Sequence, residues 1–219
     1  LMKSVIAPDR CIRCGGCIAA CPVAAIEFKN QKPLLVSKCE HCGVCYTHCP
    51  RTGLDFDDIE KTIFGRVRNE NESMGIYIDV KLAKAKDKKI LEKAQSGGVI
   101  TALLKYALDK GYIDAAILTK ISSENAWEPI PYLARTGEEV IECAGSKFSV
   151  SPVNSLIGEV YYEYANYVGC KYCINRVALV GLPCQIESLR KMQFSEYGSL
   201  KIGDLVGLTI SLFCWNNYL

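Results

Sequence analysis

The chain of 219 residues and 24.2 kDa is 49% hydrophobic and 23% charged, which excludes a disordered or coiled-coil protein and suits one sizeable domain or two small ones. Its 26 basic residues nearly balance its 24 acidic ones, giving a net charge of +2, which argues against nucleic acid or an anionic membrane surface as a partner. The longest apolar run, residues 205–215, falls short of the roughly 20 residues that cross a bilayer, so we expect a soluble protein without a transmembrane segment.

Cysteine is the unusual component of this sequence, because there are 13 of them and eight precede residue 50. The N-terminus lacks the apolar core of a signal peptide, so we expect the chain in the cytoplasm, where disulfides are rare. Metal or cluster ligation is therefore the better explanation of so many cysteines.

The first eight cysteines form a duplicated motif. The spacing C-x2-C-x2-C-x3-C-P occurs once at Cys11, Cys14, Cys17 and Cys21 before Pro22, and again at Cys39, Cys42, Cys45 and Cys49 before Pro50. Three thiolates in one tight loop suit one face of a 4Fe-4S cubane, and in two-cluster ferredoxins the fourth cysteine ligates the other cluster. The prediction is one cluster on Cys11, Cys14, Cys17 and Cys49, and a second on Cys39, Cys42, Cys45 and Cys21.

Glycines beside these cysteines fit the same interpretation. Gly15, Gly16 and Gly43 suit loops that need a positive φ or a close approach of the backbone to cluster sulfur. A pair of zinc sites is the alternative, although zinc ligands usually come as two C-x2-C units across a longer spacer. Residues 1–58 therefore resemble a bacterial-type 2x(4Fe-4S) ferredoxin.

Beyond this segment the expected elements follow one another in chain order. Residues 55–73 are charged and poor in apolar side chains, which predicts a linker with about one helical turn and a domain boundary. Strands are expected over 76–85, 113–119, 130–135, 139–143, 176–181 and 206–214, and helices over 99–109, 151–167 and 183–192. Strands that alternate with helices predict an α/β sheet. The expected organisation is a ferredoxin domain over 1–58, a linker over 59–75 and an α/β domain over 76–219.

Two expected strand-to-helix junctions are candidate ligand sites. They are Gln95-Ser96-Gly97-Gly98 and Gly181-Leu182-Pro183-Cys184-Gln185, where small residues let helix amides face a phosphate or the edge of a flavin. The structural alternative is that Ser96 is only a helix N-cap and Pro183 only a first-turn proline. The sequence has neither a G-x-G-x-x-G after a strand nor a Walker A motif, so neither a standard dinucleotide site nor an NTPase is predicted.

These motifs occur in an ordered set that resembles one known family. The set comprises the ferredoxin motif and residues 94–104, 144–148, 180–186 and 212–214. The chain resembles the β subunit of coenzyme F420-reducing hydrogenase and its relatives. These relatives are the electron-input subunit of F420H2 dehydrogenase, the β subunit of F420-dependent formate dehydrogenase and the flavin half of F420-dependent sulfite reductase.

The resemblance implies an α+β ferredoxin-like N-terminal domain followed by an α/β flavin-binding domain. It implies an F420-dependent oxidoreductase subunit that binds FAD, exchanges a hydride with coenzyme F420 as substrate, and passes single electrons through 4Fe-4S clusters. By this analogy the flavin is bound by Gln95, Ser96, Gly97, Gly98, Thr101, Lys147, Gly181, Leu182, Pro183 and Gln185. A solvated surface lysine is the alternative for Lys147.

The same resemblance implies partners and a location. The expected partner is a larger redox enzyme: a hydrogenase, formate dehydrogenase, heterodisulfide reductase, membrane F420H2 dehydrogenase or sulfite reductase. Such a protein lies in the cytoplasm or at the periphery of a membrane complex.

Four later cysteines form a candidate third 4Fe-4S cluster. Cys184 and Cys214 match family positions associated with a cluster beside the flavin, and Cys170 with Cys173 would complete the set. Unligated thiols, a redox-active dithiol and zinc are the alternatives. Cys143 is expected to be a small buried apolar residue. The family continues past this region with a further C-x-x-C, so the chain, which ends at Leu219, is expected to be a piece of a longer polypeptide.

Two other functions remain open alternatives. One is an electron-transfer adaptor whose α/β part carries no cofactor and only docks the ferredoxin onto a partner. The other is a flavin reductase of the same family with a different substrate. Bound flavin separates the first alternative from the family function, and a titration with F420 separates the second.

Overall fold

The computed structural model describes residues 1–164, 174–195 and 202–214, and its N-terminal part reproduces the cysteine duplication as two similar turns. The elements of this part are η1 (Met2–Ile6), α1 (Gly16–Ala19), β1 (Ile26–Lys29), β2 (Lys32–Leu35), α2 (Val44–Thr47) and η2 (Pro50–Thr52), with β1 and β2 paired antiparallel. Gly15 and Gly43 precede α1 and α2 with φ values of 84° and 80°. This left-handed conformation is the one that glycine adopts without strain, as expected from the sequence.

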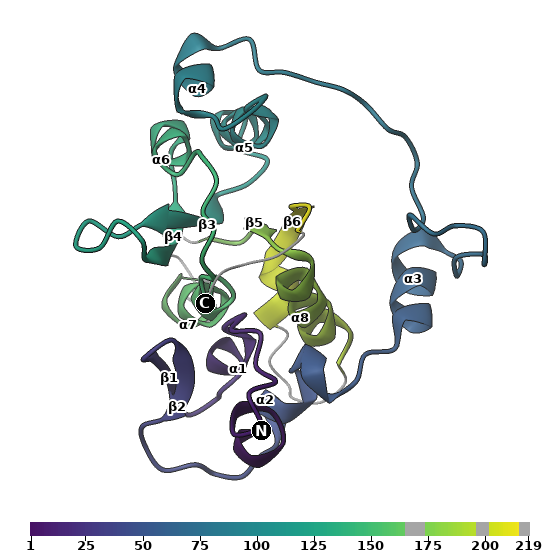
Figure 1. Ribbon diagram of the computed structural model, residues 1–219, viewed down its shortest axis with the longest axis vertical. Helices are drawn as coiled ribbons and strands as arrows, with labels where there is room; N and C mark the ends of the chain where they lie inside the picture. Colours follow the sequence, from purple (N-terminus) through teal and green to yellow (C-terminus); the bar gives the residue numbers. More distant parts are fainter. Residues whose placement is uncertain (165–173, 196–201, 215–219) are drawn as a thin grey trace.

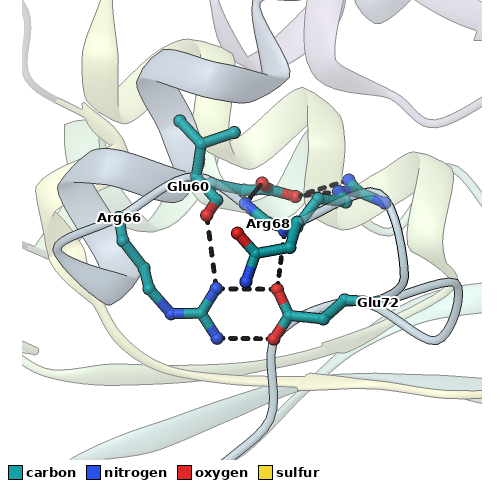
Figure 2. A network of polar contacts seen from close by, with 6 residues as sticks. Glu60, Arg66, Arg68 and Glu72 are labelled. Carbon is teal, nitrogen blue, oxygen red and sulfur yellow. Dashed lines mark hydrogen bonds and ion pairs between the residues drawn. The ribbon is translucent and has the colours of Figure 1, made fainter.

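A helix and an ion-paired turn follow the second cysteine motif. Helix α3 (Phe56–Phe64) starts where the Asp55 carboxylate accepts a hydrogen bond from the Asp58 N–H and ends at Gly65, so this segment is more ordered than the predicted linker. Glu60, only 7% exposed, accepts bonds from the backbone N–H of Arg68 at 2.9 Å and from its Nε at 2.5 Å. Arg66 and Glu72 form a bidentate ion pair at 2.6 and 2.7 Å (Figure 2). These bonds of Glu60 and Glu72 to Arg68 and Arg66 hold the residues after α3 in a defined turn.

The predicted strand over 76–85 is wrong. This segment is an extended stretch without helix or strand between α3 and α4 (Lys88–Lys93) (Figure 1). Ile78 is 99% exposed and Leu82 is fully exposed. The alternation of apolar and polar residues has the period of a strand, but a strand also needs a partner, and none of the described strands pairs with this segment.

A four-stranded sheet carries the rest of the fold. Its strands are β3 (Ala115–Ile121), β4 (Pro129–Ala134), β5 (Val177–Gly181) and β6 (Val206–Ser211), arranged in the order β4-β3-β5-β6. Strand β4 is antiparallel to β3, whereas β3, β5 and β6 are parallel. The strand predictions at 113–119, 130–135, 176–181 and 206–214 are confirmed within a few residues at their ends. The fold is mixed α/β, as predicted.

Helices cover both faces of this sheet (Figure 1). Ala116 and Leu118 of β3 pack with α5 (Val99–Asp109) and α6 (Gly137–Glu142). Ala115 and Ile117 point to the other face and pack with α7 (Ser155–Tyr164), α8 (Pro183–Phe194) and η3 (Ile202–Leu205). The strand predicted over 139–143 is wrong, because Thr136 and Glu139 form a capping box that starts α6.

The N-terminal part packs on the α7 and α8 face of the sheet. Ala19 and Ala20, at the end of α1, belong to the same buried cluster as Ile157 of α7 and Leu189 of α8. A side chain at Gly158 would approach the Ala19 backbone to 2.7 Å, so α1 and α7 are in backbone contact. The cysteine loops are thereby held directly against the α/β sheet. Within the described ranges, every helix is too short or too polar to cross a membrane.

Candidate functional site

The eight N-terminal cysteines lie in two groups. Cys11, Cys14, Cys17 and Cys49 line one small apolar pocket, whose wall also includes Val5 and Phe28. Burial raises the pKa of Cys45, and the nearby thiols of Cys21, Cys42 and Cys39 raise it further. The fourth cysteine of each repeat therefore lies with the first three of the other repeat, which is the arrangement that the sequence predicts.

Burial makes the thiols of Cys14 and Cys17 in the first group hard to ionise in the absence of a metal. It raises the pKa of Cys14 to about 12 and that of Cys17 well above its ordinary value, and the neighbouring thiols add to both effects. A metal that binds here must displace these protons, since the thiolate is the ligand. Soft sulfur donors in an apolar setting fit an iron-sulfur cluster.

The spacing within each group also bears on what it could hold. Among the residues that the structure describes, no three Cys, His, Asp or Glu side chains converge closely enough for a single metal ion. A 4Fe-4S cubane gives each cysteine its own iron, so it accepts sulfurs that are farther apart than the ligands of one zinc ion. The duplicated spacing and the grouping of the eight cysteines fit two 4Fe-4S clusters.

The two groups differ in their surroundings. Cys14, Cys17 and Cys49 are buried, whereas Cys42 of the second group is exposed and the neighbouring His41 is exposed as well. The first group lies inside, against α7 and α8. In the second group Cys21 is buried, Cys39 and Cys45 are partly exposed, and Cys42 is exposed, so this group lies nearer to solvent on the Cys42 side.

Close contacts fix the first cysteine loop against α7 and α8. The backbone N–H of Asn154 donates to the Cys14 carbonyl at 3.1 Å. A side chain on Gly15 would overlap the backbone of Pro152, and one on Gly16 would overlap the hydroxyl of Ser188. Both glycines are therefore needed where the loop meets the sheet domain.

Polar groups of α8 meet this loop. The Ser188 hydroxyl is buried and lies close to the Cys14 sulfur. Within the described part of the chain it has no hydrogen-bond partner in normal geometry. The Lys191 ammonium donates to the carbonyls of Cys49 at 2.8 Å and Gly53 at 2.5 Å, and to the hydroxyl of Thr52 at 3.0 Å.

A larger pocket of about 670 Å³ lies at the carboxyl ends of β3, β5 and β6. Its walls come from the N-terminal ends of α5 and α8 and from the loop over 144–149. Ligands of parallel α/β sheets bind in this position, outside the carboxyl ends of the strands. The structure places nine of the ten residues predicted for flavin binding in the walls of this pocket: Gln95, Ser96, Gly97, Gly98, Thr101, Lys147, Gly181, Leu182 and Gln185. Pro183 is the exception, because it is exposed and outside the pocket wall.

The start of α5 brings the backbone close to this pocket. Gly98 is the N-cap and has a φ of 66°, and a side chain there would come within 2.8 Å of Ile90. A side chain on Gly97 would come within 2.9 Å of the Ala83 carbonyl. Because no side chain caps this helix, its first amides remain available to an acceptor in the pocket.

Lys147 lines the same pocket, but its ammonium group is already hydrogen-bonded to the protein backbone. It donates to the carbonyls of Cys143, Ala144 and Gly145, the residues that follow α6. Burial lowers the pKa of Lys147. Its three donors therefore cap the end of α6, and its charge contributes to the pocket only as a positive field.

The floor of the pocket is a buried polar network that the sequence motifs did not predict. The Gln185 side chain accepts from the Leu182 N–H at 2.8 Å and donates to the Ser151 carbonyl at 2.7 Å. The Asn154 Nδ2 donates to the Gln185 carbonyl at 2.8 Å. Of its members only Gln185 and Leu182 belong to a motif, and Asn154 and Ser151 carry no local sequence signal.

The candidate third cluster is described only in part. Cys214 lines the larger pocket, and its thiol raises the pKa of the half-buried Cys184 together with burial and Glu187, so the two cysteines are near neighbours. Cys170 and Cys173 lie outside the described residues. Cys143 is buried against α5 and β3, as predicted, and lines the pocket.

Comparison with known families matches the chain in three segments. Residues 80–158 match the N-terminal part, and residues 174–218 the C-terminal part, of the family described as coenzyme F420 hydrogenase/dehydrogenase, beta subunit. Residues 3–50 match the 4Fe-4S dicluster domain.

Individual relatives agree with these matches. Coenzyme F420 hydrogenase subunit beta of Methanosarcina barkeri is 33% identical over 149 residues, which are 68% of this chain and 48% of that protein. One of the subunits of the F420H2 dehydrogenase of Methanosarcina mazei is 27% identical over 223 residues, which cover 99% of this chain and 56% of that protein. A chain in the solved F420-reducing NiFe hydrogenase complex of Methanosarcina barkeri aligns with a TM-score of 0.55 at 30% identity, over 65% of this chain and 49% of that one. The chain thus spans about half the length of these relatives.

Proposed function

Because the chain belongs to the family of coenzyme F420 hydrogenase/dehydrogenase beta subunits, we propose that it is an electron-transferring part of an F420-dependent oxidoreductase. In this proposal it exchanges a hydride between coenzyme F420 and FAD at the larger pocket. The cysteine groups hold two 4Fe-4S clusters that pass single electrons to or from a partner redox enzyme.

The pocket at the carboxyl ends of β3, β5 and β6 is the observation that carries this proposal. Its volume of about 670 Å³ lies within the range of roughly 300–1,000 Å³ that is usual for small-molecule and cofactor sites. Its lining combines polar residues, such as Ser96 and Thr101, with apolar ones, such as Leu118, Leu212 and Phe213. A dinucleotide flavin needs both, because it joins an apolar ring system to a pyrophosphate.

The residues of the pocket would act mainly by positioning and charge. Helix α5 presents uncapped amides at its N-terminus and Lys147 adds a positive field, both of which favour an anionic group. Ser151 has a buried hydroxyl that is unpartnered within the described residues and lies in the pocket wall, so it is free to serve a ligand. Leu104, Leu118 and Val140 are buried apolar residues of the lining and would help to exclude water from a bound ring system.

FAD, when bound, supplies the conversion between two-electron hydride chemistry and one-electron transfer. The cysteine groups then provide the one-electron route, since 4Fe-4S clusters change by one electron at a time. Their position against α7 and α8 places this route next to the pocket wall that contains Gln185.

The test is anaerobic purification followed by cofactor analysis and addition of reduced F420. The proposal expects bound FAD, about eight irons per chain, and bleaching of the flavin absorbance when reduced F420 is added. Iron without flavin would leave only an electron-transfer adaptor, and flavin that does not respond to reduced F420 would indicate a different substrate. Either result would refute the proposal.

A matched pair of variants tests the pocket itself. Gly97→Val places a branched side chain against the Ala83 carbonyl and into the pocket wall, so it should abolish FAD retention. Gly207→Val in β6 is the control, because nothing lies within 4 Å of a side chain there and valine suits a strand. Circular dichroism establishes that both variants fold. A folded Gly97→Val protein with full FAD content would exclude this site.

A further inference from the structure

Helix α8 runs from the larger pocket to the first cysteine group. Gln185, in its first turn, lines the pocket. Ser188 lies three residues on, about 4.5 Å along the helix axis, and meets Gly16 and Cys14. Lys191 comes three residues later and binds the Cys49 carbonyl. One face of one helix therefore contacts both sites.

A second connection runs through Asn154, which is completely buried. Its backbone N–H donates to the Cys14 carbonyl at 3.1 Å, and its Nδ2 donates to the Gln185 carbonyl at 2.8 Å. A single residue thus joins the cysteine loop to the pocket floor. The loop of the second group reaches the same core through the partly buried Val44, while its Cys42 is exposed.

Ser188 is the group in this contact that lacks a partner. Its hydroxyl is fully buried and makes no hydrogen bond of normal geometry within the described ranges. It points at the position that a side chain on Gly16 would occupy, beside the Cys14 sulfur. Buried hydroxyls are almost always hydrogen-bonded in folded proteins, so an acceptor is expected here. A thiolate sulfur that ligates a cluster is an acceptor, whereas a neutral thiol is a weak one.

We propose that Ser188 is a positioning residue that donates a hydrogen bond to the Cys14 thiolate of the first cluster. In the same proposal this inner cluster exchanges electrons with the pocket, and the second cluster faces the partner. The proposal rests on the proposed function, since it assumes clusters on the two cysteine groups. It adds an order of electron transfer and a residue that sets the potential of one cluster.

The electron balance of this route is simple. A hydride delivered to the pocket brings two electrons and one proton. The electrons leave singly through the inner cluster, so that one comes to rest on each cluster, and the proton is released to water. Reduction makes a cluster more negative, so a hydrogen bond to its sulfur stabilises the reduced form and raises its reduction potential.

The experiment is a redox titration of the cluster-loaded protein, monitored by electron paramagnetic resonance, on wild type, Ser188→Ala, Ser188→Thr and the control Ser123→Ala. Ser123 is exposed and lies in the loop after β3. A soluble dysprosium chelate distinguishes the clusters, because it broadens the signal of the exposed one more strongly. Flavin and F420 are not needed, so this measurement remains decisive even if the proposed hydride chemistry fails.

In Ser188→Ala we expect the potential of the inner cluster alone to fall by roughly 59 mV, which for one electron is a tenfold change in the ratio of reduced to oxidised cluster. Ser188→Thr keeps the donor, so Ser188→Thr protein that folds and retains both clusters should have the wild-type value, and Ser123→Ala should leave both clusters unchanged. Equal inner-cluster potentials in wild type and Ser188→Ala would overturn the hydrogen bond. A shift confined to the exposed cluster would overturn the assignment of Cys14 to the inner one.

The order of transfer is tested with Cys42→Ala, which lacks one ligand of the second cluster. If the inner cluster receives electrons first, reduced F420 should still reduce the remaining cluster in this variant at the wild-type rate. Loss of that reduction while the flavin still bleaches would overturn the order.

Discussion

The contact between Gly16 and Ser188 makes a strong prediction about stability. In Gly16→Ala the new methyl group would overlap the Ser188 hydroxyl and come within 2.9 Å of the Met192 methyl. The Met192 side chain is flexible and can move away, but Ser188 is held on α8 and its hydroxyl has little room within a fully buried site. The serine oxygen is therefore the main obstacle.

The expected cost follows from the chemistry of overpacking. Inserting a methyl group into a tightly packed contact costs about 1–3 kcal/mol. Alanine is a better helix former than glycine, but Gly16 is the first residue of a four-residue helix, so this gain is a small part of the roughly 1 kcal/mol seen in a helix interior. For a chain of this size, each kcal/mol lowers the melting temperature by about 2–4 °C.

A double-mutant cycle identifies the atom responsible. Ser188→Ala removes the hydroxyl and leaves its Cβ 3.5 Å from the new methyl group, which is an ordinary contact. The double variant should therefore recover most of the loss, with an interaction energy of at least about 0.5 kcal/mol. The assay is apparent melting temperature by circular dichroism at one fixed scan rate, under anaerobic conditions and with clusters loaded. Additive effects of the two substitutions would refute this packing argument.

Three further predictions follow from the N-terminal part. Glu60→Gln should weaken the buried bonds to Arg68 and increase trypsin cleavage after Arg68 several-fold relative to wild type. The ion pair with Arg66 lowers the pKa of Glu72 from 4.5 to about 2. The stabilising effect of this ion pair is therefore complete above pH 4.5 and is lost as the pH falls toward 2. Pepsin cleavage of this turn should rise over that interval in wild type but not in Glu72→Gln. Cys42→Ala should lower the iron content by about four atoms per chain and abolish electron transfer to a partner, while a normal flavin response to reduced F420 shows that the pocket is intact.

Local patterns in the sequence predict most of the sheet correctly because the physical signal is local. Val177 to Leu179 form a continuous apolar run, and the strand there is buried on both faces between helices. The helix that begins after Gly98 and ends at Lys110 was predictable from its apolar period and its glycines. The residues of such an element and their immediate neighbours are enough to predict it from the sequence.

Two failed strand predictions have different causes. The capping box of Thr136 and Glu139 is present in the sequence, so the helix at 137–142 was predictable, and the β-branched residues Val140 and Ile141 favoured the wrong assignment. The extended stretch over 76–85 is different, because its pattern is that of a strand and only the absence of a partner in the described fold decides the outcome.

Nine of the ten residues that the family resemblance implied for the ligand line the larger pocket, but the resemblance did not include the floor of the pocket. Gln185 appears in a motif, whereas Asn154 does not, and its two hydrogen bonds join segments that are far apart in the sequence. Lys147 was expected to offer its ammonium to a ligand, yet the carbonyls after α6 take all three donors. Contacts of this kind depend on tertiary packing and leave no local pattern.

The difference between the two cysteine repeats nevertheless contains information about their roles. Gly15 and Gly43 are equivalent and both have positive φ, so the loop geometry explains them in each copy. The next position is Gly16 in the first repeat and Val44 in the second. A cluster loop alone does not require this second glycine, because Val44 starts α2 in the same way that Gly16 starts α1. Contact with Ser188 does require it. Gly16 therefore marks the position where the first loop touches α8 directly, whereas the partly buried Val44 of the second loop packs against the same core and leaves Cys42 exposed.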